Sequence, residues 1–197
     1  MPRELGHYYF KKYFRIQPEI LNQVNTFTEK HFEGKEVVSV HYRGTDKVCN
    51  SENCEAVRVS YEDMLKHVKV QLEGKDLEKT VIFIASDEEP FVQFMEQKFP
   101  GKVVSTNVQR SVDGKPLHLG SKNPYKTGEE ALIDCLLLAR GDVLIRTSSN
   151  LSLFVKYINP DMKIIEASQR TVMKQLIKKM VQSMKEAGIE AAISIGV

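Results

Sequence analysis

Charged and hydroxyl side chains gather directly after three apolar segments of the sequence. They are His41, Arg43, Thr45, Asp46 and Lys47 after the first segment, Ser86, Asp87 and Glu88 after the second, and Thr147, Ser148, Ser149 and Asn150 after the third. The guanidinium group of Arg43 is permanently charged and offers paired donors that match phosphate oxygens. Residues 147–150 precede a predicted helix, and a helix N-terminus favours anions. These residue types indicate a polar site of the kind that binds a nucleotide.

Several familiar cofactor motifs are missing from the sequence. No G-x-G-x-x-G follows the first apolar segment, so a dinucleotide site is not expected. Residues 114–120 begin and end in glycine, but their spacing and the order Ser-Lys do not fit a P-loop. H-E-x-x-H, G-x-S-x-G and D-x-D are also absent, and we therefore expect no metal at this site. A diphosphate would have to be neutralised by Arg, backbone N–H groups and helix N-termini.

The apolar pattern predicts strands that alternate with helices. Strands are expected at 36–42, 80–86, 102–106, 142–147 and 162–167. Helices are expected at 18–34, at 61–72, from Pro90, from Thr127 to Gly141, at 149–158 and from Ser168 onward, with long loops at 43–60 and 107–126. This alternation is typical of the α/β class, here a Rossmann-like, doubly wound and mostly parallel sheet. Ligands of such sheets bind at the carboxyl ends of the strands, where the three polar segments fall.

The composition limits the function further. The chain has 197 residues, with 28 Lys and Arg against 26 Asp and Glu and a formal net charge of +2. Nucleic-acid binding by bulk charge is therefore not expected. No apolar run approaches the roughly 20 residues of a membrane helix, so no membrane span is expected. Three cysteines exclude a disulfide framework, although a pairing of Cys49 with Cys54 stays open.

We expect one domain over residues 1–197, with a nucleotide-binding site at the strand ends. Residues 1–16 would lead into it, and residues 168–197 would form a C-terminal helix and tail. The start of the chain is too charged and aromatic for a secretory signal. The expected compartment is cytoplasmic, or Golgi or secretory if the sequence is a fragment of a longer chain.

Four sequence segments resemble motifs of a known enzyme family, in the same order. H-Y-R-G-T-D-K at 41–47 resembles the H-x-R-R-T-D-K motif of α1,6-fucosyltransferases, with related forms in nodulation and protein O-fucosyltransferases. I-A-S-D-E at 84–88 is similar to the family's A-T-D-D segment. Two further segments of the sequence are similar to segments of the family. One comprises Leu117-His118, Tyr125 and Leu132-Ile133-Asp134, and the other comprises G-D-V-L-I at 141–145 and T-S-S at 147–149.

The resemblance implies the C-terminal, GDP-fucose-binding half of a two-domain GT-B glycosyltransferase. The implied reaction is an inverting, metal-independent fucosyl transfer to a glycan or protein hydroxyl, with the GDP-sugar as donor substrate and no cofactor. An acceptor domain should precede residue 8, so an absent N-terminal domain or a homo-oligomer would be needed to complete the site.

The resemblance also implies roles for individual residues. His41 and Asp134 would contact guanine or ribose, and Arg43 would hold the β-phosphate. Lys47 and Glu55 would activate the acceptor, because a carboxylate there could take the hydroxyl proton. The remaining substrate-binding residues would be Asp46, Asp87, His118, Ser148, Ser149 and Asn150.

The sequence departs from the family pattern at one charged position. Gly44 stands where the family has its second Arg, so one positive charge is lost. The loop at 48–54 is longer than the family's. An alternative function is therefore a non-catalytic nucleotide- or partner-binding domain with a degenerate glycosyltransferase fold.

Simpler structural roles stay open for the same residues. Arg43 could form an ion pair with Asp46, and His41 could be an ordinary buried histidine. A buried Asp134 wants a partner, which could be guanine or an internal Arg or Lys. Acidic and hydroxyl residues after strands often cap helices, and capping is the interpretation favoured for Glu88.

Overall fold

The computed structural model describes residues 1–45, 48–49, 56–112 and 123–168. Several predicted features lie outside these ranges, so they stay predictions. They are the site residues Asp46, Lys47, Glu55 and His118, the pairing of Cys49 with Cys54, and the C-terminal helix and tail.

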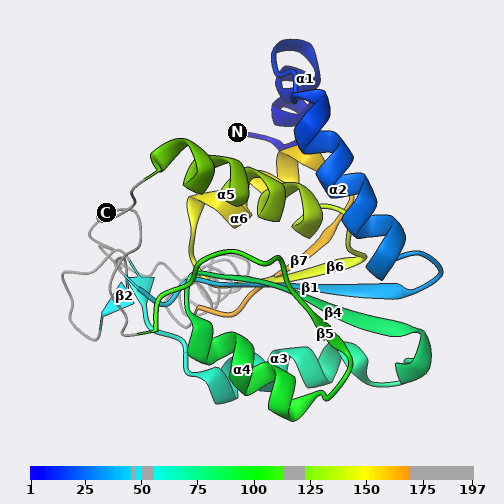
Figure 1. Cartoon of the computed structure of the whole chain (residues 1–197), viewed down its shortest axis with the longest axis vertical. Coiled ribbons are helices and arrows are strands. Elements are labelled where there is room, and N and C mark those ends of the chain that lie inside the picture. Colours follow the sequence, from blue (N-terminus) through cyan, green and yellow to red (C-terminus); the bar gives the residue numbers. More distant parts are fainter. Residues whose placement is uncertain (46–47, 50–55, 113–122, 169–197) are drawn as a thin grey trace, which may run out of the picture.

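A five-stranded, all-parallel sheet in the order β5-β4-β1-β6-β7 forms the centre of the molecule (Figure 1). Its strands are β1 (Glu36–Tyr42), β4 (Thr80–Ser86), β5 (Val103–Val104), β6 (Val143–Arg146) and β7 (Lys163–Glu166). The chain adds β4 and β5 on one side of β1, and then crosses over to add β6 and β7 on the other side. This change of direction at β1 creates the crevice in which such sheets bind ligands.

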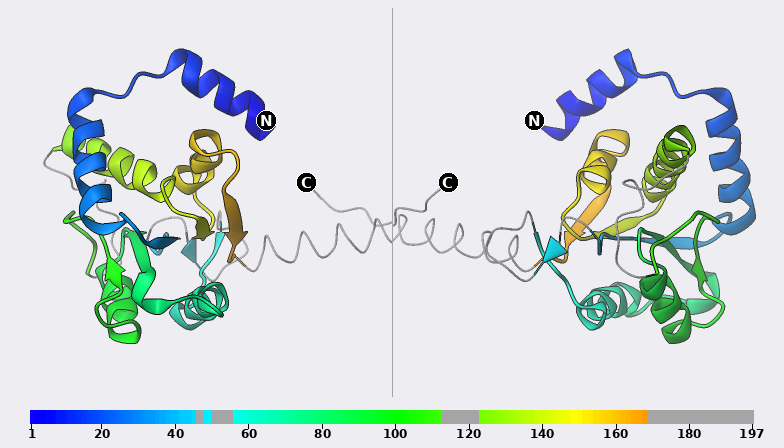
Figure 2. Two further views of the ribbon diagram at one scale, coloured as in Figure 1. Left: turned by 90° about the vertical axis from the view of Figure 1, so that its right-hand side faces the viewer. Right: turned by 60° about the vertical axis from the view of Figure 1, so that its left-hand side comes forward.

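Helices cover both faces of the sheet (Figures 1 and 2). One face packs against α2 (Pro18–His31), α5 (Pro124–Leu138) and α6 (Asn150–Ile158), and α1 (Arg3–Tyr13) lies on α6. The other face packs against α3 (Tyr61–Leu72) and α4 (Glu89–Lys98). The short elements are β2 (Val48–Cys49), β3 (Ala56–Val57) and η1 (Leu77–Lys79). The doubly wound α/β fold expected from the sequence is confirmed.

The two cores follow from the alternation of side chains along the strands. Val37 of β1 packs in the core under α2 and α5, while Val38 and Val40 pack in the core over α3 and α4. All seven residues of β4 are buried. A strand covered on both faces must be apolar on both, which explains the nearly continuous apolar runs in the sequence.

Some predicted boundaries are wrong. Helix α5 begins at Pro124 and not at Thr127, because the side chain of Asn123 caps it by accepting a hydrogen bond from the Lys126 N–H at 3.1 Å. Proline is favoured in the first turn because its missing N–H is not needed there. Strand β5 is limited to Val103–Val104.

Two further elements were not expected. Helix α1 lies in the segment that was predicted only to lead into the domain, and the β2–β3 pair lies in the expected 43–60 loop. Within the described ranges, no helix is both long and apolar enough to cross a membrane.

Candidate functional site

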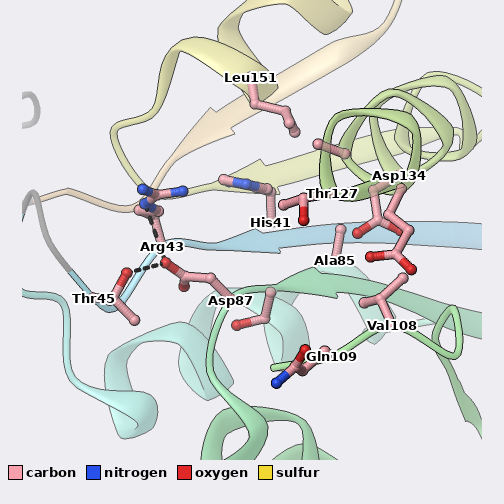
Figure 3. A pocket seen from close by; sticks show the side chains of 13 residues that line it. His41, Arg43, Thr45, Ala85, Asp87, Val108, Gln109, Thr127, Asp134 and Leu151 are labelled. Atoms are coloured by element: carbon pink, nitrogen blue, oxygen red, sulfur yellow. Dashed lines mark hydrogen bonds and ion pairs between the residues drawn. The ribbon is translucent and has the colours of Figure 1, made fainter. Parts of the chain in front are cut away.

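A cleft lies at the carboxyl ends of β1 and β4, beside the first turns of α5 and α6 (Figure 3). Figure 3 shows Arg43, Thr45 and Asp87 at one end of the cleft and Asp134 at the other, with His41 between them. Strand ends therefore bring together residues that are far apart in the sequence. This is the edge of the sheet at which the polar segments were expected to meet.

The Arg43 end of the cleft is organised by one carboxylate. Asp87 accepts hydrogen bonds from the Gly44 N–H at 2.9 Å and from the Thr45 hydroxyl, and it pairs with Arg43 Nε at 3.1 Å. Asp87 follows β4, while the three donors follow the neighbouring strand β1. Asp87 therefore braces the turn that carries Arg43.

Thr147 joins this turn to β6. Its hydroxyl oxygen accepts a hydrogen bond from the Arg43 N–H at 2.8 Å, and its own N–H donates to the His41 carbonyl oxygen at 3.0 Å. Ser148 and Ser149 follow, and Asn150 begins α6. Ser148, Ser149 and Asn150 do not line the cleft. Leu151, at the start of α6, does line it.

His41 lies in the middle of the cleft and is only 6% exposed. Burial, together with the positive charges of Arg146 and Arg43, lowers the pKa of His41 to about 3, so the ring is neutral at ordinary pH. Among the described residues, its Nδ1 atom has no hydrogen-bond partner. A buried polar atom without a partner is costly, and a ligand with a complementary group would satisfy it.

Asp134 of α5 lies at the far end of the cleft and is 8% exposed. Burial raises the pKa of its carboxyl group to about 6, although the hydrogen bond from the Thr106 hydroxyl, at 2.6 Å, acts in the opposite direction. Arg110 also lowers this pKa, and Glu130 raises it. The internal partner of Asp134 is therefore a threonine, and the carboxyl group still borders the cleft.

Glu88 occupies the N-cap position of α4, as favoured from the sequence, but its side chain makes no capping hydrogen bond. The side chain is buried, the residue being 3% exposed, and accepts hydrogen bonds from Arg58 Nη2, at 2.8 Å and 3.1 Å, and from the Tyr61 hydroxyl, at 2.8 Å. These partners lie about thirty residues earlier in the chain, which local sequence signals could not indicate. The Glu88 N–H donates to the Ser86 hydroxyl oxygen at 3.1 Å.

Several side chains that line the cleft were not expected from the sequence, among them Thr127, Glu130 and Gln109. Thr127 and Glu130 lie on the first turns of α5, on the same side as Asp134. Glu130 and Asp134 are four residues apart and therefore share a helix face. That spacing is visible in the sequence, but the T-G-E-E run at 127–130 also fits an ordinary capping box.

The cleft is suited to a ligand in which an anionic group is linked to a polar ring. Arg43 provides a positive charge, and His41 and Asp134 provide a neutral ring and an acceptor. No group of three or more His, Cys, Asp or Glu side chains that could hold a metal occurs in the described part of the chain.

Solved structures that share this fold are fucosyltransferases. A NodZ α-1,6-fucosyltransferase co-crystallised with GDP gives a TM-score of 0.54 at 20% identity, over 77% of this chain and 44% of that chain. A mutant of Arabidopsis thaliana FUT1 in complex with GDP gives 0.52 at 12% identity, over 82% and 35%. POFUT1 in complex with GDP-fucose gives 0.51 at 14% identity, over 83% and 49%.

At these low sequence identities, the structural similarity shows only that the proteins share a fold. The chain spans about half the length of the NodZ and POFUT1 proteins that it matches. No curated protein sequence matches it. The sequence model of one family, however, matches residues 3–181, which is most of the chain. The chain therefore belongs to the nodulation protein Z (NodZ) family.

Proposed function

We propose that the chain is the donor-binding half of a fucosyltransferase, with GDP-fucose as the donor. The observation that carries the proposal is the division of the cleft into a cationic end at Arg43 and a buried end at His41 and Asp134. Family membership supports the proposal, as do the GDP and GDP-fucose complexes of structural relatives.

The diphosphate lies at the Arg43 end of the cleft. Asp87 pairs with the guanidinium group through Nε, and the permanent charge and planar donor geometry of a guanidinium match phosphate oxygens. Arg43 binds the β-phosphate and stabilises the charge that develops on GDP as it leaves. Ser148, Ser149 and Asn150 are the further phosphate-binding residues of the proposal, through their hydroxyl and amide side chains. No metal ion is required, because arginine and N–H donors neutralise the phosphates.

The guanine base lies at the other end of the cleft. Guanine presents adjacent N–H donors at N1 and N2, and the Asp134 carboxylate accepts from both when it is ionised. His41, which is neutral, contacts the base or the ribose through its unpartnered Nδ1. Because adenine and uracil lack this pair of adjacent donors, the arrangement favours GDP over ADP and UDP.

The reaction is an inverting transfer. The acceptor hydroxyl attacks the anomeric carbon of fucose as the bond from that carbon to the β-phosphate oxygen breaks, and GDP leaves with both bond electrons. Glu55 takes the hydroxyl proton, and Lys47 assists acceptor activation. His118 and Asp46 complete the substrate contacts. The acceptor is a glycan or protein hydroxyl, held by a further domain or a second copy.

A non-catalytic role is the alternative function. It is favoured by Gly44, which stands where the family motif has its second arginine and so removes a positive charge. Such a domain would bind the nucleotide without transferring the sugar.

Calorimetric titration with GDP, UDP and ADP tests the donor proposal. We expect GDP to bind at least about tenfold more tightly than the other two, a difference of about 1.4 kcal/mol. Equal affinities, or no binding of GDP, would contradict the proposal. Release of GDP from GDP-fucose, measured with candidate acceptors and with water alone, then separates the two functions, because sustained release that depends on Arg43 rejects the non-catalytic role.

A further inference from the structure

Arg146 carries a buried charge immediately behind the proposed donor site. It is the last residue of β6 and is 6% exposed. It forms an ion pair with Glu166, its neighbour in the register of β7, whose side chain is 12% exposed. Two buried charges are expensive to take out of water, and well-packed apolar residues at such positions are often equally stable. The pair therefore calls for an explanation other than stability.

The remaining donors of Arg146 hold the segment that follows β6. Its Nε donates to the Ser152 hydroxyl oxygen at 2.9 Å, and its Nη2 donates to the Ser149 carbonyl oxygen at 2.7 Å. One guanidinium thus connects the end of β6, the first turn of α6 and β7. Ser148 is also held, because its N–H donates to the hydroxyl oxygen of Ser168, just after β7, at 2.9 Å.

This segment in turn holds Arg43. Thr147 lies between Arg146 and the serines, is 3% exposed, and accepts the Arg43 N–H through its hydroxyl oxygen at 2.8 Å. The chain of contacts therefore runs from Glu166 through Arg146 and Thr147 to the backbone of Arg43. A change at Arg146 would alter the position of the phosphate-binding turn without touching the nucleotide.

Arg146 is also the neighbour of His41 in the register of β1 and β6. Its charge is one of the causes of the low pKa of His41, after burial. A neutral residue at position 146 would make protonation of His41 easier. The same side chain therefore acts on the turn of Arg43 and on His41 in the middle of the cleft.

We propose that Arg146 is a positioning residue of the donor site, which fixes residues 147–150 and, through Thr147, the turn of Arg43. The inference rests on the proposed function for the identity of the ligand, but the contacts themselves are independent of it. Arg146 does not line the cleft, so its effect is exerted through the residues that it holds.

Four variants of the 197-residue chain separate positioning from stability. Arg146→Met removes the charge, and Arg146→Lys keeps the charge but loses the planar guanidinium that reaches three oxygens. The double variant Arg146→Met/Glu166→Leu replaces the ion pair by apolar residues, which restores folding if Arg146→Met alone unfolds. Leu144→Ala, in the same strand and fully buried, is the control that lowers stability without touching the segment.

Two readouts are measured for each variant. The first is the hydrogen-exchange rate of the Arg43 amide relative to the core amides of β4, with no ligand present. The second is the dissociation constant of GDP by calorimetry. A third signal, the titration of the His41 ring followed by NMR, should move to higher pH in Arg146→Met.

We expect the relative exchange of the Arg43 amide and the dissociation constant of GDP each to rise about tenfold or more in Arg146→Met. The double variant should recover the melting temperature but neither of these values, and Arg146→Lys should lie in between. Leu144→Ala should lower the melting temperature alone. A double variant with an unchanged Arg43 amide would overturn the positioning role. If the wild type does not bind GDP, the proposed function fails, and the exchange of the Arg43 amide alone then decides the role of Arg146.

Discussion

Gly44 lies directly against the carboxylate of Glu88. A Cβ atom placed on Gly44 would lie 2.3 Å from the Glu88 carboxyl carbon and one of its oxygens. The carboxylate cannot easily move aside, because Arg58 and Tyr61 hold it by hydrogen bonds. The space in which the related fucosyltransferase motif has a second arginine side chain is therefore filled in this chain by the side chain of residue 88.

Replacement of Gly44 should therefore be destabilising. We expect Gly44→Ala to lower the free energy of unfolding by about 1–3 kcal/mol through overpacking, and Gly44→Arg to lower it further and weaken GDP binding. Gly128→Ala is the matched control, because a Cβ there meets nothing within 4 Å. It should raise stability by up to about 1 kcal/mol, as expected in a helix. Urea unfolding measures all three, and a Gly44→Arg protein that is more stable or binds GDP more tightly would refute the steric explanation.

Asp134 should make stability fall as the pH rises. Its pKa in the folded protein, about 6, lies above that of an unfolded aspartate, so the folded state binds more protons between pH 4 and 6. The stabilisation that the protonated carboxyl group provides is fully present below pH 4. About 3 kcal/mol of the free energy of unfolding is lost as the pH rises through 6. Urea unfolding of Asp134→Asn against pH should lack this loss. An identical pH profile in the variant and the wild type would contradict the assignment.

The same titration should control binding of the donor. An ionised Asp134 accepts the guanine donors, so the affinity for a GDP-sugar should fall as the pH drops below about 6. The sugar ester is used because its diphosphate does not itself titrate in this range. Calorimetry at pH 5 and pH 7.5 measures the effect, which Asp134→Asn should abolish while it weakens binding at both values.

His41 should have the opposite effect on stability. Its pKa of about 3 lies well below that of an unfolded histidine, so the unfolded state binds more protons between pH 6.5 and 3. The stability that the neutral ring provides is present above pH 6.5, and on the order of 5 kcal/mol is lost as the pH falls through 3. His41→Gln, which does not titrate, should resist acid better relative to its own stability at pH 7. A variant that loses stability in acid as steeply as the wild type would show that His41 is not the group responsible.

Asp87 should be required to hold the turn of Arg43. Asp87→Ala removes the acceptor for the Gly44 N–H and the Thr45 hydroxyl, and the ion-pair partner of Arg43 Nε. We expect GDP affinity to fall about tenfold, with a smaller loss in Asp87→Asn. Glu96→Gln, an exposed change on α4, is the control. Tighter GDP binding in Asp87→Ala would instead mean that the carboxylate competes with phosphate.

The sheet could be predicted from the sequence because its strands are buried on both faces. The segments 36–42 and 80–86 are nearly continuous apolar runs, and the structure places β1 and β4 over the same residues. The start predicted for α5 was wrong, because two sequence signals for a helix start lie close together there. The capping-box pattern at Thr127 is local and convincing, but Pro124 preceded by Asn123 begins the helix one turn earlier.

The site could be predicted only in outline. That Arg43, Asp87 and Asp134 share one cleft follows from the topology of parallel strands, together with the resemblance of the motifs. The partners of these residues did not follow. Among the described residues Asp87 pairs with Arg43, and Thr106, which follows β5, donates to Asp134. Such pairs depend on where distant strands and loops lie in the fold.

The effect of Arg43→Ala on nucleotide affinity tests the proposed donor site most directly. Calorimetric titrations with GDP and with GMP are compared for the wild type, Arg43→Ala and Arg140→Ala, in which an arginine bound to Asn25 on another surface is removed. We predict that Arg43→Ala weakens GDP binding by about tenfold to a hundredfold, weakens GMP binding much less, and that Arg140→Ala changes neither. GDP binding that is equally tight without Arg43, or absent from the wild type, would contradict the proposal that this cleft holds the diphosphate of a GDP-sugar.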